Sequence, residues 1–185
     1  MKQKLKLALV GAGERGQYCY APYAKMHGYE IEFVAVADPH KGRREKFVQD
    51  YHVPAEGVFE TAEQFFARPR MADAVLICTQ DSQHYAYACQ AIDLGYSILL
   101  EKPISPSARE CLDLQRRAEE KGTQIMVCHV MRYTKFYRKL KELIDSGVIG
   151  DVVHVTHTEN VAYWHYAHSY VRGNWHKTAD SSPMI

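Results

Sequence analysis

The sequence predicts an α/β fold, a doubly wound parallel sheet followed by the beginning of a second domain of the α+β class. Short apolar runs alternate with amphipathic stretches, which is typical of βαβ units. A glycine-rich turn directly follows the first apolar run. Near the end of the chain the pattern becomes one of alternating apolar and polar residues, which favours an antiparallel or open-faced sheet.

Five strands are expected in the first domain. Their sequences are continuously apolar and rich in leucine or β-branched residues, as expected for parallel strands covered on both faces. The expected strands are Leu5–Val10, Ile31–Ala37, Ala74–Thr79, Ser97–Leu100 and Gln124–Val130.

Two of the helices between these strands have recognisable ends. One is expected to run from a cap at Ser82 to Leu94, and the other from a cap at Ser105 to a stop at Gly122. The helix after the glycine-rich turn contains Pro22, which removes a backbone hydrogen bond and should kink or interrupt it.

We place a domain boundary near residue 129, so that residues 1–129 form the first domain and residues 130–185 begin an incomplete second one. In the second part, a helix is predicted from Lys135 to Ser146, followed by a half-exposed strand over Asp151–Val161. The tail is rich in aromatic residues and histidine, and it ends on apolar residues without a stop signal. We therefore expect a chain cut within a domain.

The composition excludes several classes of protein. Among 185 residues, 23 are Lys or Arg and 22 are Asp or Glu, so the net charge of +1 gives no field for nucleic acid. Five cysteines, without CxxC spacing, argue against a disulfide framework or a zinc knuckle. No apolar run approaches the roughly 18 residues of a membrane span. We expect a cytoplasmic protein without nucleic-acid or membrane partners.

The segment GAGERG places Gly11, Gly13 and Gly16 in the GxGxxG spacing of a dinucleotide-binding turn. Gly11 permits the tight turn, Gly13 lets the backbone approach the pyrophosphate, and Gly16 allows close packing of helix on strand. Glu14 and Arg15 fill the variable positions, at the start of a helix whose free N–H groups would face the phosphates. A glycine turn without a nucleotide is the alternative interpretation.

Asp38 follows the second strand, 22 residues after Gly16. A carboxylate at this place accepts hydrogen bonds from the adenosine ribose and repels a 2′-phosphate, which favours NAD over NADP. Arg43 and Arg44 complicate this prediction, although their simpler interpretation is an exposed helix face. NAD is therefore the expected cofactor, and NADP the less favoured one.

Polar residues also follow two other strands at their carboxyl ends, where ligands bind in open parallel sheets. They are Thr79, Gln80, Asp81 and His84 after one strand, and Glu101, Lys102 and Pro103 after the next. A lysine at this edge can bind or polarise a substrate oxygen. An exposed structural lysine fits the spacing equally well.

Together these segments resemble the glucose-fructose oxidoreductase/inositol dehydrogenase (Gfo/Idh/MocA) family. The family's order and usual separations are kept by four segments, GAGERG, VAVADP, TQDSQH and EKPIS, and the later LKELIDSGVIGDVVHV is similar to its entry into a second domain. The resemblance covers essentially the whole chain. It implies an NAD-binding Rossmann domain over residues 1–129, the start of a substrate and oligomerisation domain over residues 130–185, and a homo-oligomer at full length.

The resemblance implies roles for individual residues as well. The lysine of the family's EKP element lies by the nicotinamide and the substrate hydroxyl, which gives Lys102 the catalytic role and implies a cis Lys102–Pro103 bond. The family's Thr-Pro-Asn-x-x-His element contacts the cofactor, and this chain departs from it at two positions. The cofactor-binding residues are then expected to be Gly11, Gly13, Glu14, Arg15, Gly16, Asp38, Thr79, Gln80, Asp81, His84, Glu101, Lys102 and Pro103.

The family's second catalytic element, an acid and a histidine, follows a loop that resembles Gly173–Ile185, and the sequence ends before it. Candidate substrate residues, with surface or packing roles as the alternative, are Arg132, Tyr163, His165, His168, Arg172 and Asn174. His165 and His168 are three residues apart, but no carboxylate or cysteine completes a metal site, so no metal is expected.

The expected activity is that of an NAD-dependent oxidoreductase, with hydride passing between a nicotinamide and a secondary hydroxyl of a sugar, cyclitol or related polyol. The alternatives are a net non-redox glycoside cleavage through transient oxidation, and a non-enzymatic nucleotide-binding regulator. Because the acid–histidine pair is absent, we expect the 185-residue chain to bind NAD without turning over substrate.

Overall fold

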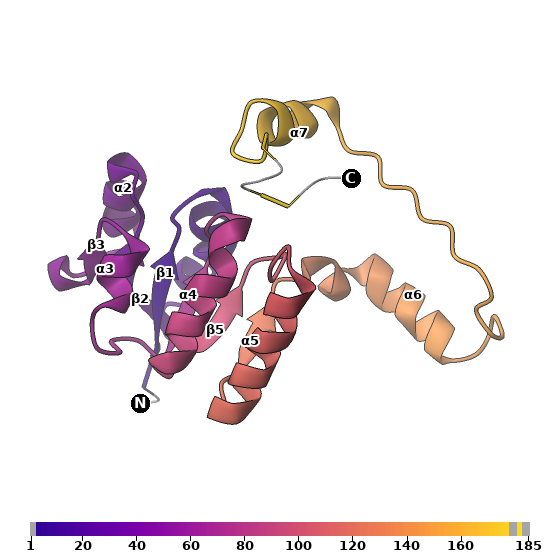
Figure 1. The fold of residues 1–185 in the computed structure, drawn as a ribbon, viewed down its shortest axis with the longest axis horizontal. Coiled ribbons are helices and arrows are strands. Elements are labelled where there is room, and N and C mark those ends of the chain that lie inside the picture. The colour runs from indigo at the N-terminus through magenta and orange to yellow at the C-terminus, as the bar shows by residue number, and fades with distance from the viewer. Residues whose placement is uncertain (1–2, 178–180, 183–185) are drawn as a thin grey trace.

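The computed structural model describes residues 3–177, 181 and 182. Six parallel strands form one sheet in the order β3-β2-β1-β4-β5-β6 (Figure 1), which confirms the predicted α/β class. The order reverses between β1 and β4, as in a doubly wound sheet. The strands are β1 (Leu5–Val10), β2 (Ile31–Ala37), β3 (Val58–Phe59), β4 (Ala74–Ile77), β5 (Ser97–Leu100) and β6 (Ile125–Val127).

Helices and helical turns connect the strands and cover the sheet. They are η1 (Glu14–Tyr20), α1 (Pro22–Met26), α2 (Lys41–Tyr51), η2 (Ala55–Gly57), α3 (Ala62–Phe66), α4 (Asp81–Asp93) and α5 (Ala108–Lys121). The chain continues after β6 through η3 (Val130–Tyr133), α6 (Lys135–Asp145), α7 (Tyr163–Tyr166) and η4 (Ala167–Val171).

Side chains that alternate along the strands build a core on each face of the sheet. Ala8 and Val10 of β1 join Phe65, Ala88 and Leu114 from α3, α4 and α5 on one face. On the other face the core is made by Leu7, Leu9, Ala24, Phe33 and Phe47, from β1, α1, β2 and α2. Burial on both faces explains why the strands are mainly apolar. The charged residues Lys6 of β1 and Glu32 of β2 lie near the strand starts, where the side chains are not buried.

The predicted strands agree closely with the observed ones. The predicted limits are confirmed for β1, β2 and β5, whereas β4 ends at Ile77 and β6 spans only Ile125–Val127. Most of the residues that these two strands lose, among them Thr79 and Cys128, lie in the loops at the carboxyl edge of the sheet. The two-residue strand β3 and the short helix α3 were not predicted.

The caps of α4 and α5 lie two residues from the predicted ones, and the predicted stop of α5 at Gly122 is confirmed. Helix α4 begins at Asp81 with Gln80 as its cap, so the predicted cap Ser82 lies inside the first turn. The cap of α5 is Ser107, whose hydroxyl accepts from the N–H of Glu110, and not Ser105. The interruption predicted at Pro22 is confirmed, because π-helical η1 ends before it and α1 starts with it.

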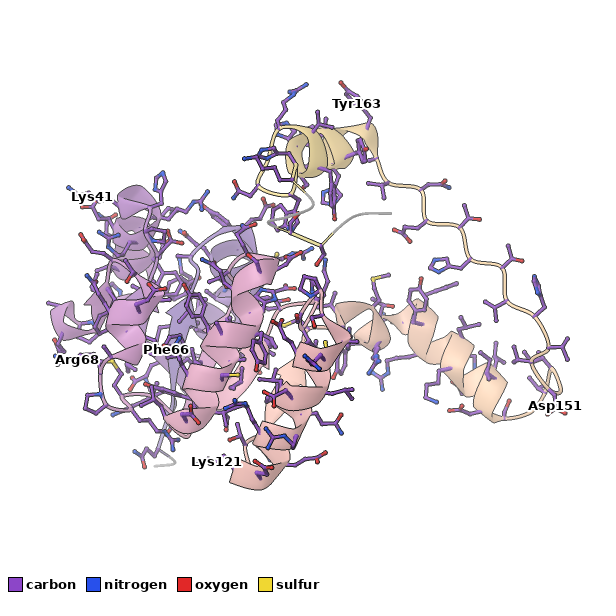
Figure 2. The ribbon with its side chains drawn as sticks, viewed as in Figure 1. Lys41, Phe66, Arg68, Lys121, Asp151 and Tyr163 are labelled. Atoms are coloured by element: carbon purple, nitrogen blue, oxygen red, sulfur yellow. The ribbon has the colours of Figure 1, made fainter. Side chains whose placement is uncertain are left out.

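The predicted strand over Asp151–Val161 is wrong. Residues 151–162 run as an extended segment without strand pairing, and their side chains stand away from the sheet domain between the labelled Asp151 and Tyr163 (Figure 2). The alternating pattern is present, but no neighbouring strand among the described residues supplies the hydrogen-bond partners that a strand needs. Helix α6 lies beyond the sheet (Figure 1) and leaves Phe136 71% exposed.

Within residues 3–177, 181 and 182, no helix is both long enough and apolar enough to cross a membrane.

Candidate functional site

The loops that follow β1, β2, β4, β5 and β6 all emerge at the carboxyl edge of the sheet, because the strands are parallel. Backbone hydrogen bonds tie the first residues of these loops to the neighbouring strands. The N–H of Gly11 donates to Ala37, that of Cys78 to Val10, and that of Glu101 to Ile77. Most of the predicted site residues therefore lie along one edge.

The three glycines of the turn after β1 have different reasons to be glycine. Gly11 has a φ of +94°, and a Cβ there would lie 2.5 Å from the carbonyl oxygen of Cys78. A Cβ on Gly16 would overlap the backbone oxygen of Gly11 and lie 2.8 Å from Leu9 Cδ1. At Gly13 the nearest atom to a Cβ is Arg43 Nη1, at 4.0 Å. Packing therefore requires glycine at residues 11 and 16, and leaves residue 13 open towards a ligand.

Asp38 is bound by the backbone around it. Its Oδ2 accepts from the N–H of Ala12 at 2.7 Å and its Oδ1 from the N–H of His40 at 2.8 Å. The residue is only 4% exposed. The carboxylate predicted to meet the ribose thus also clamps the glycine turn to the start of α2.

Arg44 departs from the exposed position expected for it. It is buried, and its Nη1 donates to the carbonyl oxygen of Asp38 at 2.6 Å while Nη2 lies 3.2 Å from Glu60 Oε1. Arg43 is exposed, as expected. The guanidinium of Arg44 is therefore part of the scaffold.

The loop after β4 is joined to the loop after β5 by His84. Its ring is fully buried, with Nδ1 2.6 Å from the carbonyl oxygen of Pro103 and Nε2 3.2 Å from that of Thr79. His84 therefore holds the backbones of these two loops together. The Lys102–Pro103 bond is cis, as the resemblance implies.

Glu101 is a buried carboxylate beneath this loop. Its Oε1 accepts from the hydroxyl of Tyr20 at 2.5 Å, and its Oε2 accepts from the N–H of Lys102 at 2.9 Å. Arg15 Nε lies 3.8 Å from the same carboxylate. The carboxylate therefore connects η1 with the backbone of Lys102. Sequence reasoning missed Tyr20, because its contact joins residues 81 positions apart.

These contacts shift the ionisation of the buried groups. Burial, with hydrogen bonds to Cys128 and Glu101, raises the pKa of Tyr20 well above its ordinary value. Burial also raises the pKa of the Cys128 thiol, and the charge of Glu101 adds to that effect. Burial, the largest single effect, lowers the pKa of Arg15, but Glu101, Cys19 and Tyr20 together outweigh it and raise the pKa. Tyr20 and Cys128 therefore stay protonated at neutral pH.

A cavity of about 330 Å³ opens beside this network. It brings Lys102 together with Arg132, two residues predicted independently for the site. The remaining lining residues are Arg15, Glu101, Cys128, His129, Val130 and Met131. The other candidate substrate residues lie on α7, η4 and the following turn and do not line this cavity: Tyr163, His165, His168, Arg172 and Asn174.

Asp81, at the start of α4, binds two residues of the tail. Its Oδ1 accepts from Trp175 Nε1 at 3.1 Å and its Oδ2 from the N–H of Ser182 at 3.1 Å. The tail therefore lies next to the N-terminal end of α4 (Figure 1). Residues 178–180 and 183–185 of the predicted loop lie outside the described residues. Sequence reasoning had assigned Asp81 to the cofactor and had missed Trp175.

We expect Asp81→Ala to release Trp175 from the domain, because the substitution removes both hydrogen-bond acceptors of the tail. In a Trp164→Phe background Trp175 is the remaining tryptophan, since the chain has two. Its emission should shift to longer wavelength and become easier to quench with acrylamide. Asp93→Ala, at the other end of α4, is the matched control. An unchanged spectrum in Asp81→Ala would contradict the contact.

Among the described residues, no three side chains of His, Cys, Asp or Glu gather as a metal site would require. Two features fit a dinucleotide. Gly13 leaves its backbone open, and the side-chain oxygens of Thr79 and Gln80 are buried without a hydrogen-bond partner in the described part of the chain. Buried polar atoms are normally satisfied, so these two are suited to a polar ligand.

Comparison with known proteins gives matches along most of the chain. The inositol 2-dehydrogenase of Pseudomonas savastanoi is 32% identical over 157 residues, which are 83% of this chain and 46% of that protein. The scyllo-inositol 2-dehydrogenase (NADP⁺) of Bacillus subtilis is 26% identical over 88% of this chain and 42% of its own length. The chain spans about half the length of the curated relatives it matches.

Among solved structures, the WlbA dehydrogenase of Bordetella pertussis, in complex with NADH and UDP-GlcNAcA, has the same fold. Its TM-score is 0.72 at 20% identity, over 80% of this chain and 44% of that one. The model of the Gfo/Idh/MocA oxidoreductases, described as an oxidoreductase family with an NAD-binding Rossmann fold, matches residues 5–129. This chain is therefore a member of the Gfo/Idh/MocA oxidoreductase family.

Proposed function

We propose that the chain supplies the dinucleotide site of an NAD-dependent dehydrogenase acting on a secondary hydroxyl of a sugar, cyclitol or related polyol. One observation carries the proposal. Arg15, from the glycine turn, lines the same cavity as Lys102, so the turn and the lysine face one space. The domain limits of 1–129 and 130–185 belong to this proposal.

The residues of the edge divide into three groups under this proposal. Gly13, the N-terminal N–H groups of η1, Thr79 and Gln80 would hold the dinucleotide, which when bound accepts or supplies hydride at its nicotinamide. Lys102 would orient and polarise the substrate oxygen, and Arg132 would bind the substrate across the cavity. Glu101 and His84 would fix the backbone of the lysine loop. A polyol, with several hydroxyl oxygens, suits a cavity lined by such cations.

The names of the relatives support a polyol substrate at the level of the family. Those named above include an inositol 2-dehydrogenase and a scyllo-inositol 2-dehydrogenase. One of them is described as using NADP⁺, so family membership leaves the choice between the two cofactors open. For this chain we propose NAD, because Asp38 directly follows β2, at the place where the ribose would lie.

Calorimetry of the 185-residue chain with NADH tests the dinucleotide site, with adenosine as the control that lacks phosphates. We expect NADH to bind and to raise the melting temperature. We also expect no reduction of NAD with inositols or other polyols, because the acid–histidine pair implied by the resemblance is absent and loss of a general base costs about 10²–10⁴-fold. Failure to bind NADH would refute the proposal, and turnover would make His165 or His168 the candidate base.

A further inference from the structure

The helix that follows the glycine turn, η1, is a π-helix, in which backbone hydrogen bonds join residues five apart. The N–H of Ala21, for example, donates to the carbonyl oxygen of Gly16 at 3.0 Å. Residues five apart lie close to one turn from each other in this geometry, whereas an α-helix would place them roughly 140° apart around its axis. The π-helical turn therefore brings Arg15 and Tyr20 to the same side of η1.

Both of these side chains reach the carboxylate of Glu101. The hydroxyl of Tyr20 donates to Oε1 at 2.5 Å, and Arg15 Nε lies 3.8 Å from the same oxygen. The other oxygen, Oε2, accepts from the backbone N–H of Lys102 at 2.9 Å. Within the described residues, Tyr20 is the only side chain that donates a hydrogen bond to this carboxylate.

The burial of Glu101 makes this hydrogen bond important. The residue is 6% exposed, so water is a poor substitute for a lost donor. A buried carboxylate oxygen without a donor keeps its desolvation cost uncompensated. Without the hydroxyl of Tyr20 the carboxylate would turn towards other donors, and its contact with the N–H of Lys102 would change. The position of the Lys102 backbone therefore depends on a hydroxyl that the glycine-turn helix supplies.

We propose that Tyr20 is a positioning residue for the reaction, which acts on Lys102 through Glu101. The side chain of Lys102 lies at the cavity, while its backbone is held by the carboxylate. Placement matters there, because a displacement of about 1 Å can cost about 100-fold in rate. Since η1 follows the glycine turn, the same contact joins the cofactor side of the site to the substrate side. This proposal rests on the proposed function, which gives Lys102 to the substrate oxygen.

Tyr20→Phe, in a form extended to the length of the curated relatives, tests the proposal, because it removes one hydroxyl and keeps the ring. We expect kcat with the polyol to fall about tenfold or more, the effect of losing a hydrogen bond to a charged group. The KM for NAD and the affinity for NADH should stay within about threefold, because the glycines of the turn are unchanged. Damage to the fold would instead lower binding and turnover together.

Tyr18→Phe is the matched control, because it removes a hydroxyl from the same helix, where Tyr18 is 61% exposed. It should leave kcat and the affinity for NADH within about twofold. A second comparison tests whether Tyr20 acts through Glu101. Glu101→Gln should itself lower kcat, and adding Tyr20→Phe to it should lower kcat by less than about twofold more, because residues that act as a unit are not additive.

Three results would overturn the proposal: normal kcat in Tyr20→Phe, losses that multiply in the double variant, or an equal loss in Tyr18→Phe. A fall in NADH affinity as large as the fall in kcat would also overturn it, because Tyr20 would then support the cofactor turn and not the lysine. If the unsubstituted extended form oxidises no polyol, the proposed function itself has failed, which is a separate outcome.

Discussion

Replacing Gly16 with alanine should unfold or strongly destabilise the domain, whereas the same change at Gly13 should leave it folded and unable to bind NADH well. At residue 16 the new methyl group would overlap the backbone oxygen of Gly11, which cannot move without disturbing β1. Overpacking of this kind costs about 1–3 kcal/mol or more. At residue 13 the backbone has a φ of −76°, which alanine adopts without strain.

The methyl group on residue 13 would point into the space left for the ligand. No atom lies nearer to it than Arg43 Nη1 at 4.0 Å, so the stability should change by less than about 0.5 kcal/mol. A dinucleotide needs the backbone itself at this position, and the affinity for NADH should fall at least about tenfold. The pair of variants thus separates folding from binding within one turn.

Urea denaturation measures the first effect and calorimetry with NADH the second. Gly122→Ala serves as a control for the substitution itself, because Gly122 ends α5 at a φ of +64° with no atom within 4 Å. It should lose some stability and no affinity. Full NADH binding by Gly13→Ala would show that the pyrophosphate does not approach the turn, and normal stability of Gly16→Ala would show that the turn adapts.

The fold was predictable wherever short-range patterns determine it. The strand β1 is flanked by a glycine turn and buried on both faces, so both its ends and its type are visible in the sequence. The two residues of β3 are too few to show a pattern. The segment Asp151–Val161 has the pattern of a strand, but pairing depends on a partner distant in sequence, which periodicity does not reveal.

The candidate site was predictable in its backbone and less so in its side-chain contacts. The glycine spacing identified the turn, because packing in the turn requires glycine at Gly11 and Gly16. The contact of Tyr20 with Glu101 joins residues 81 positions apart, and that of Trp175 with Asp81 joins residues 94 positions apart. No local pattern in the sequence predicts such contacts. The simpler interpretation of Arg44, an exposed helix face, is wrong, because two acceptors hold its guanidinium in the scaffold.

The backbone and the side chain of Lys102 have different surroundings. Its backbone N–H is held by Glu101, which Tyr20 and Arg15 hold in turn, while its side chain is exposed at the cavity shared with Arg132. The loop should therefore keep its shape without the ammonium group. A substitution at Lys102 should therefore change the charge in the cavity and leave the scaffold intact.

Lys102→Ala should accordingly keep its affinity for NADH within about threefold. We propose that the lysine acts on the substrate oxygen and does not contact the pyrophosphate. Turnover should fall about 10²–10⁴-fold, the usual effect of removing a group that assists proton transfer. Binding is measured on the 185-residue chain. Turnover is measured on a form extended to the length of the curated relatives, with the polyol that it oxidises.

Lys102→Met, which keeps the length of the side chain without its charge, should behave like the alanine variant, because the charge and not the stem acts on the oxygen. Lys121→Ala, at the exposed end of α5, is the matched control and should retain both binding and turnover. Loss of NADH binding in Lys102→Ala, together with normal residual turnover, would move the lysine from the substrate to the cofactor. Such a result would leave Arg132 and His129 as the cavity's remaining polar groups for the substrate oxygen, since Arg15 and Glu101 bind each other.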